Sequence, residues 1–179
     1  MSGLPAKIVA LHRALERAQL PHAFGGALAL AWCTQRARGT IDIDVNVFVS
    51  PEHSEAVFKC LPGGVTHTAK DLAIIRREGQ VRLWWEQTPI DLFLNTTRFH
   101  DDAAQRTRWE TFSDRPIPFL SCEDIAVFKA FFNRTKDWAD LEEMHAAGTL
   151  DLSAVVAVLV EYLGAADERI ERLKTIVRS

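Results

Sequence analysis

The stretch Gly39-Thr-Ile-Asp-Ile-Asp-Val-Asn-Val-Phe-Val49 is rich in β-branched residues and alternates between two kinds of side chain. Aliphatic residues occupy every odd position from 41 to 49, while Asp42, Asp44 and Asn46 occupy even positions between them. Because successive side chains of a strand point to opposite faces, this pattern predicts a strand over residues 41–49. The two aspartates then lie on the same face, roughly 6.5–7 Å apart along the chain.

Two carboxylates at that spacing repel each other unless a cation or a base lies between them. Their hard oxygen atoms suit Mg²⁺ (or Mn²⁺), which takes the rest of its ligands from water and substrate phosphates. A third carboxylate, Asp91, is flanked by Ile90, Leu92 and Phe93, and an ionised group in that setting needs a partner. Asp42, Asp44 and Asp91 are therefore the candidate metal ligands, and with two bound ions they would form a site for phosphoryl chemistry.

A pair of glycines, Gly25 and Gly26, precedes the small apolar stretch 27–33, which favours a helix. Glycines let the main chain approach a ligand closely, and a helix N-terminus presents free N–H groups that attract phosphate. Since this pair comes shortly before the Asp-x-Asp strand, it is the candidate cradle for a nucleoside triphosphate.

The remaining pattern predicts an α/β (α+β) fold, with a mixed β-sheet flanked by helices and a helical segment at the C-terminus. Apolar spacing and capping residues predict helices over 4–19, 27–33, 50–61 and 69–78, the last ending at Gly79. Residues 81–86 and 90–94 are expected to form two strands joined by a short turn. From Ser121 onward only helical patterns follow, so we expect an α/β core over 1–120 and helices over 121–179.

Composition limits the classes of function. The 179 residues are 47% hydrophobic and 25% charged, which indicates a folded chain, and the net charge of −3 argues against a general nucleic-acid coat. The three cysteines lie far apart without a CxxC motif, so we expect reduced intracellular thiols and no zinc site. The sequence contains no signal peptide or apolar segment long enough for a bilayer, which predicts a cytoplasmic protein that does not bind membranes.

Several motifs together resemble the polymerase-β-like nucleotidyltransferase superfamily, and within it the small bacterial MenT/AbiEii-type enzymes. The resemblance rests on the following motifs: Gly25-Gly26, Arg38-x-Thr40-x-Asp42-x-Asp44, Asp91, the stretch Glu123-Asp-Ile-Ala-Val-Phe-Lys129, and Arg134-Thr-Lys-Asp137-Trp-Ala-Asp140-Leu. These motifs span roughly residues 22–145, which is most of the chain.

The resemblance implies a magnesium-dependent enzyme that transfers a nucleoside monophosphate from an NTP, such as ATP, and releases pyrophosphate. Asp42 and Asp44 would bind metal, with Asp91 as third ligand or general base. The implied nucleotide-binding residues are Gly25, Gly26, Arg38, Thr40 and Lys129, and Asp137 and Asp140 would support the site. Many relatives carry Ser or Thr directly after the glycines where this chain has Ala27, so one phosphate hydrogen bond is missing.

Three alternatives for the function stay open, and two of them differ in the acceptor. A tRNA end, in a toxin–antitoxin system with an antitoxin partner, would suit an arginine-rich middle segment containing Arg76, Arg77, Arg82, Arg98, Arg106 and Arg108. An aminoglycoside or another small hydroxyl compound would suit an acidic pocket. A catalytically silent nucleotide- or partner-binding module is the third alternative.

Three smaller signals have ordinary structural explanations beside the functional ones. Lys129 can extend from a core helix to solvent, and Asp137 and Asp140 can form ion pairs on one helix face. The Trp84-Trp85 pair offers an aromatic surface for a base, although one such tryptophan is commonly buried.

Overall fold

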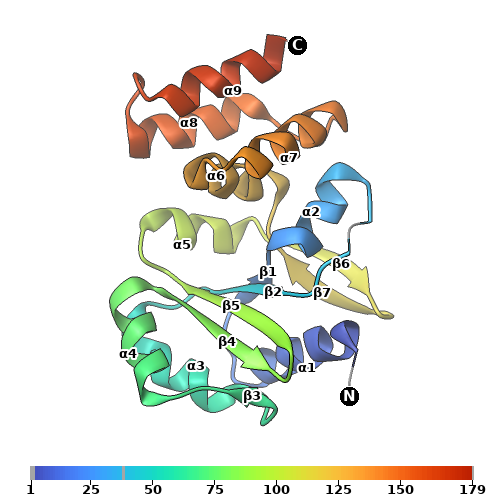
Figure 1. Cartoon of the computed structure of the whole chain (residues 1–179), viewed down its shortest axis with the longest axis vertical. Helices are drawn as coiled ribbons and strands as arrows, with labels where there is room; N and C mark the ends of the chain where they lie inside the picture. Colours follow the sequence, from blue (N-terminus) through green and yellow to red (C-terminus); the bar gives the residue numbers. More distant parts are fainter. Residues whose placement is uncertain (1–2, 38, 179) are drawn as a thin grey trace. The chain divides into compact units, whose positions relative to one another are not determined.

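The structure is a computed structural model that describes residues 3–37 and 39–178. The chain forms two compact units (Figure 1). The first consists of Met1–Leu28 with Gly39–Leu120, and the second of Ala29–Arg38 with Ser121–Ser179. Helix α2 (Gly26–Thr34) begins in the first unit and ends in the second.

The first unit is built on a mixed sheet whose seven strands, in the described residues, have the order β3-β4-β5-β2-β1-β7-β6. The pairs β2–β5 and β1–β7 are parallel and the other neighbours are antiparallel. The strands are β1 (His22–Phe24), β2 (Ile43–Val47), β3 (Val65–Thr66), β4 (Gln80–Trp85), β5 (Thr88–Leu94), β6 (Arg108–Phe112) and β7 (Arg115–Phe119). The predicted mixed α/β fold is confirmed.

The central strand β2 is shorter than the predicted strand 41–49. Ile43, Val45 and Val47 are fully buried, as the alternation predicted, but Ile41 is 78% exposed. The pairing with β5 starts at Ile43, opposite Ile90, so Ile41 has no neighbouring strand in this ladder to hold it. Asp42 therefore lies just before β2, and Asp44 lies within it.

Helices cover the sheet of the first unit. They are α1 (Leu4–Arg17), α3 (Ser54–Cys60), α4 (Ala69–Glu78) and α5 (Arg98–Gln105), with a short 3₁₀ turn, η1 (Pro51–His53), before α3. The apolar stripe of α1 is buried at Ile8, Leu11 and Leu15, and α1 packs beside α3 (Figure 1). Helix α4 ends at Gly79, whose φ of +71° makes it the predicted C-cap. The predicted helix 50–61 is divided, because its first turn is 3₁₀ rather than α.

The second unit is helical and includes the end of α2. It contains α6 (Cys122–Phe132), α7 (Thr135–Ala146), α8 (Leu152–Leu163) and α9 (Glu168–Arg178). Helix α6 contacts the other three, around a core that includes Trp138, Leu141, Val155 and Leu173. None of the helices in the two described ranges is long and apolar enough to cross a membrane.

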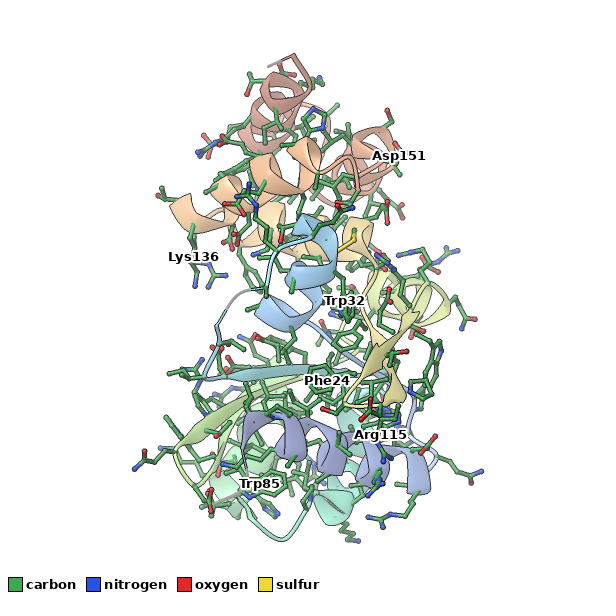
Figure 2. The ribbon with its side chains drawn as sticks, turned by 90° about the vertical axis from the view of Figure 1, so that its right-hand side faces the viewer. Phe24, Trp32, Trp85, Arg115, Lys136 and Asp151 are labelled. Carbon is green, nitrogen blue, oxygen red and sulfur yellow. A yellow bond between two sulfur atoms is a disulfide. The ribbon has the colours of Figure 1, made fainter. Side chains whose placement is uncertain are left out.

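The expectation of three reduced cysteines is wrong for two of them. Cys33, near the end of α2, forms a disulfide with Cys122, the first residue of α6, and both side chains are buried (Figure 2). Their Cα atoms lie 5.5 Å apart although 89 positions separate them in the sequence. Spacing along the chain could not reveal this pair, because it is the fold that brings the two helices together. Cys60 is not disulfide-bonded, and burial raises the pKa of its thiol.

Candidate active site

Three charged side chains form a row across neighbouring strands of the first unit. Asp44 of β2 lies opposite Asp91 of β5, and Asp91 lies opposite Arg82 of β4. Residues directly opposite each other in a sheet project from the same face, on strands about 4.8 Å apart. The strand register therefore brings Asp44 and Asp91, which are 47 positions apart in sequence, next to each other, with Arg82 on the outer side of Asp91.

Asp42 lies two residues before Asp44, just ahead of β2, and is hydrogen-bonded to Thr40. The Thr40 hydroxyl donates to the Asp42 carboxylate, and the Asp42 N–H donates back to the Thr40 hydroxyl at 3.3 Å. This local turn fixes the first aspartate before the strand begins. Arg38, the other predicted neighbour, lies outside the described residues.

Gly25 and Gly26 lie against Asp44 on the side opposite β5. The N–H of Gly25 donates to the carbonyl of Asp44 at 3.0 Å. Gly26 has a φ of +55°, and a Cβ atom at this position would overlap the carboxylate of Asp44. Gly26 also begins α2, whose first N–H groups have no partner within the helix. Glycine is thus needed here for two reasons, its backbone angle and the close carboxylate.

The sequence pattern did not identify Arg82 as part of this site. Its guanidinium forms a bidentate ion pair with Asp91, with Nε–Oδ1 at 2.7 Å and Nη2–Oδ2 at 2.6 Å. The hydrogen bonds that Arg82 donates to Asp91, together with the negative charges of Asp91, Asp42 and Asp44, raise the pKa of Arg82 above its usual value. Arg82 and Asp91 are placed symmetrically about the turn at Glu86 and Gln87, so a correctly placed turn would have revealed the pair.

The donor set suits a metal ion that arrives with phosphate. No group of three or more His, Cys, Asp or Glu side chains in the described part of the chain is arranged to hold a metal ion by itself. However, Mg²⁺ is commonly held by one or two carboxylates together with substrate phosphates and waters. Asp44 and Asp42 supply two carboxylates that both act on the charge of Arg82, and Gly26 packs against Asp44.

The other predicted site residues lie in the second unit. Lys129 of α6 donates to Asp140 at 2.6 Å and pairs with Asp137 at 3.5 Å, both on α7. Burial would raise the pKa of Asp137, but hydrogen bonds from Arg134 and the charge of Lys129 lower it below its usual value. The contact of Lys129 with nucleotide stays a prediction.

The two adjacent tryptophans differ in their surroundings. Trp84 is 46% exposed and lies on the same face of β4 as Arg82, two residues further along. Trp85 is on the opposite face of β4. The ammonium of Lys7 lies 5.8 Å from the centroid of its ring and donates to its main-chain carbonyl at 2.9 Å. Of the two tryptophans, Trp84 is therefore the one on the face that carries Asp91.

No protein-family model matches the sequence, and no curated protein matches it either. Several solved structures do match this chain. The solution structure of the antibiotic-resistance factor ANT(2'')-Ia has a TM-score of 0.56 at 17% identity, covering 97% of this chain and 90% of that one. Lincomycin-bound LnuA, a lincosamide antibiotic adenylyltransferase, has a TM-score of 0.54 at 15% identity, covering 79% of this chain and 96% of that one.

A crystal structure of ANT(2")-Ia in complex with adenylyl-2"-tobramycin has a TM-score of 0.53 at 18% identity, covering 98% of this chain and 95% of that chain. The protein has the nucleotidyltransferase fold. At these identities the likeness concerns the arrangement of helices and strands, so the roles of individual residues must come from the geometry described above. In this nucleotidyltransferase fold, the acid-bearing strands β2 and β5 lie side by side at the centre of the sheet.

Proposed function

We propose that the protein is a divalent-metal-dependent nucleotidyltransferase that transfers a nucleoside monophosphate from an NTP to a hydroxyl group of a small molecule. The observation that supports this most is the packing of Gly26 directly against Asp44, with Asp91 in register on the next strand. This arrangement provides a close approach for phosphate on one side of Asp44 and a carboxylate for the acceptor on the other.

Asp42 and Asp44 would hold the metal ion, and the main chain at Gly25 and Gly26 with the start of α2 would bind the triphosphate. A divalent cation there would neutralise charge on the phosphates and lower the pKa of the attacking hydroxyl. Asp91 orients that hydroxyl and accepts its proton. Although Arg82 donates to both carboxylate oxygens, each oxygen has a second lone pair to offer.

In the transfer step the acceptor oxygen forms a bond to the α-phosphorus of the NTP. The bond from that phosphorus to the bridging oxygen breaks, and pyrophosphate leaves with the electron pair. The proton of the hydroxyl passes to Asp91 and then to solvent. The protein therefore acts mainly by positioning and by stabilising charge.

Ion pairs in the first unit favour a small acceptor over tRNA. Five of the six arginines that suggested a phosphate-binding surface are paired with a carboxylate: Arg76 with Glu55, Arg77 with Glu78, Arg82 with Asp91, Arg98 with Asp102 and Arg108 with Glu110. These pairs reduce the positive charge available to an RNA backbone. The related folds with lincomycin and adenylyl-tobramycin in their structures agree with a small hydroxyl compound.

The test is a labelling assay with purified protein, Mg²⁺ and each α-labelled NTP. Acceptors are a panel of aminoglycosides and lincosamides in one arm and total tRNA in the other, with pyrophosphate release measured in parallel. We expect label on a small compound. Label on tRNA alone would replace the small acceptor by the toxin-like alternative, and the absence of both label and pyrophosphate would support a silent binding module.

Asp42→Asn should reduce any transfer to background, because it removes a metal ligand. The matched control is Glu52→Gln, which makes the same chemical change at an exposed position of η1. Transfer that survives Asp42→Asn would contradict the assignment of the site.

A further inference from the structure

The basic side chain of Arg82 lies beside the proposed metal site and is paired with Asp91. Both oxygens of this carboxylate are within 2.7 Å of a guanidinium nitrogen of Arg82. We propose that Arg82 is a positioning residue that keeps Asp91 out of metal coordination in the nucleotide-free protein. This inference rests on the proposed function, because it assumes that Asp42 and Asp44 bind a divalent cation.

Geometry supports this role first. A guanidinium and a carboxylate that meet through two parallel hydrogen bonds form a strong and directional pair. Mg²⁺ binds carboxylate oxygens at 2.0–2.1 Å in an almost ideal octahedron, which leaves little freedom around the ligand oxygens. A cation bound to the remaining lone pairs of Asp91 would therefore lie next to the positive charge of Arg82, which repels it.

Strand register makes the pair persistent. Arg82 and Asp91 are direct partners in the antiparallel ladder β4–β5, which continues from Gln80–Phe93 to Trp85–Thr88. Their Cα atoms cannot separate without breaking that ladder, so Arg82 returns to Asp91 whenever nothing displaces it. By contrast, the parallel partner of Asp91 is Asp44, a like charge.

Charge points the same way. Arg82 is paired with Asp91 and so offsets one of the three negative charges that Asp42, Asp44 and Asp91 bring to this region. Without nucleotide, the site then offers a cation two carboxylates, with a fixed positive group nearby. With a bound triphosphate the phosphate oxygens supply the missing ligands, so metal and nucleotide are expected to bind together.

The test measures Mn²⁺ binding to the protein without nucleotide. Binding is detected as a decrease in the electron paramagnetic resonance signal of free Mn²⁺. Arg82→Ala should bind Mn²⁺ on the order of tenfold more tightly, which is the lower end of what a changed outer-shell partner does to metal affinity. Asp91→Asn is tested together with Arg82→Ala, because Asp91→Asn alone would leave the positive charge of Arg82 without its paired carboxylate. The double variant should lose the gain of Arg82→Ala. Circular dichroism checks that each variant is folded, as expected for an arginine whose side chain is 53% exposed.

Arg77→Ala is the matched control, because Arg77 is also exposed and paired with a carboxylate, that of Glu78, but is on helix α4. Unchanged Mn²⁺ affinity in Arg82→Ala, or tighter binding that persists in the double variant, overturns the role of Arg82. Either result leaves the proposed function standing if Asp42→Asn still weakens Mn²⁺ binding. Loss of that Asp42 dependence would instead contradict the metal site itself.

Discussion

The two units each contain a cluster of basic and acidic side chains, and the clusters differ in exposure. Arg82 and Asp91 of the first unit are 53% and 20% exposed. Lys129, Asp137 and Asp140 of the second unit are 14%, 0% and 9% exposed. The buried cluster is built like a structural element, because ions without water need full pairing. The exposed one leaves its carboxylates in reach of an incoming ligand, as a site for metal and phosphate requires.

Breaking the buried cluster should produce the largest loss of stability. Lys129→Met keeps the length of the side chain but removes the charge that Asp137 and Asp140 share. Removing one partner of a buried ion pair costs about 3–5 kcal/mol. Because Arg134 still pairs with Asp137 in this variant, we expect the lower end of that range, about 3 kcal/mol. The free energy of unfolding, measured by urea denaturation followed by circular dichroism, should fall by that amount.

The matched control for this change is Lys136→Met on the same helix pair. Lys136 is exposed, and Figure 2 shows its side chain at the surface of the helical unit. Its replacement should change the free energy of unfolding by less than about 0.5 kcal/mol. Equal effects of the two substitutions would show that the Lys129 cluster is solvated and that burial is not what separates the two regions.

The sequence revealed the acids of the site more readily than their partners. Period-two alternation placed Asp42 and Asp44 on one face, and an isolated acid among apolar residues marked Asp91. What local patterns could not supply was register, which sets Asp91 beside Asp44 and Arg82 beside Asp91. Register depends on the turn position, and the turn lies at Glu86 and Gln87 rather than over residues 87–89.

Elements made by long-range pairing were likewise missed. Strand β1 has only three residues, and it is defined by its neighbours β2 and β7 rather than by a pattern of its own. Strands β6 and β7 contain few aliphatic residues, and β7 contains two prolines, which local propensity counts against a strand. The long helices were predictable, since their apolar stripes are local.

The buried pair His12 and His22 lies in the first unit. It tests whether burial, rather than the unit to which a residue belongs, determines how much a polar group contributes to stability. His22 contacts His12 at 2.9 Å and the carbonyl of Leu20 at 2.8 Å, and burial lowers the pKa of His22 to about 4. Because the folded pKa lies below the unfolded value of 6.5, the unfolded chain binds more protons between these values. Stability is therefore complete above about pH 7 and is lost as pH falls from 6.5 to 4.

The expected loss is about 3 kcal/mol, since one pKa unit corresponds to about 1.4 kcal/mol. The measurement compares urea unfolding of the natural protein and of His22→Gln at pH 7 and pH 4.5. The variant lacks this titration and should lose less stability over that interval. Parallel pH profiles for the two proteins would contradict the lowered pKa.

Gly26→Ala changes the main chain next to Asp44 in the candidate active site. The φ of +55° is unfavourable for alanine, and the new Cβ would overlap the carboxylate of Asp44. We expect a loss of about 1–3 kcal/mol in the free energy of unfolding, together with weaker NTP binding measured by calorimetry. Gly63→Ala is the control, because a Cβ at Gly63 meets no atom within 4 Å. Normal NTP binding by Gly26→Ala would remove the glycine pair from the phosphate cradle.

The smallest expected effect on stability belongs to the ion pair nearest the proposed chemistry. Arg82→Ala removes a bidentate pair, yet exposed ion pairs contribute only about 0–1 kcal/mol, because water solvates both charges well. Urea unfolding should therefore place this variant within about 1 kcal/mol of the natural protein, far from Lys129→Met. A loss as large as that of Lys129→Met would mean that Arg82 and Asp91 hold the sheet together. The Arg82–Asp91 pair would then be a structural ion pair like the Lys129 cluster, and exposure to solvent would not distinguish the two.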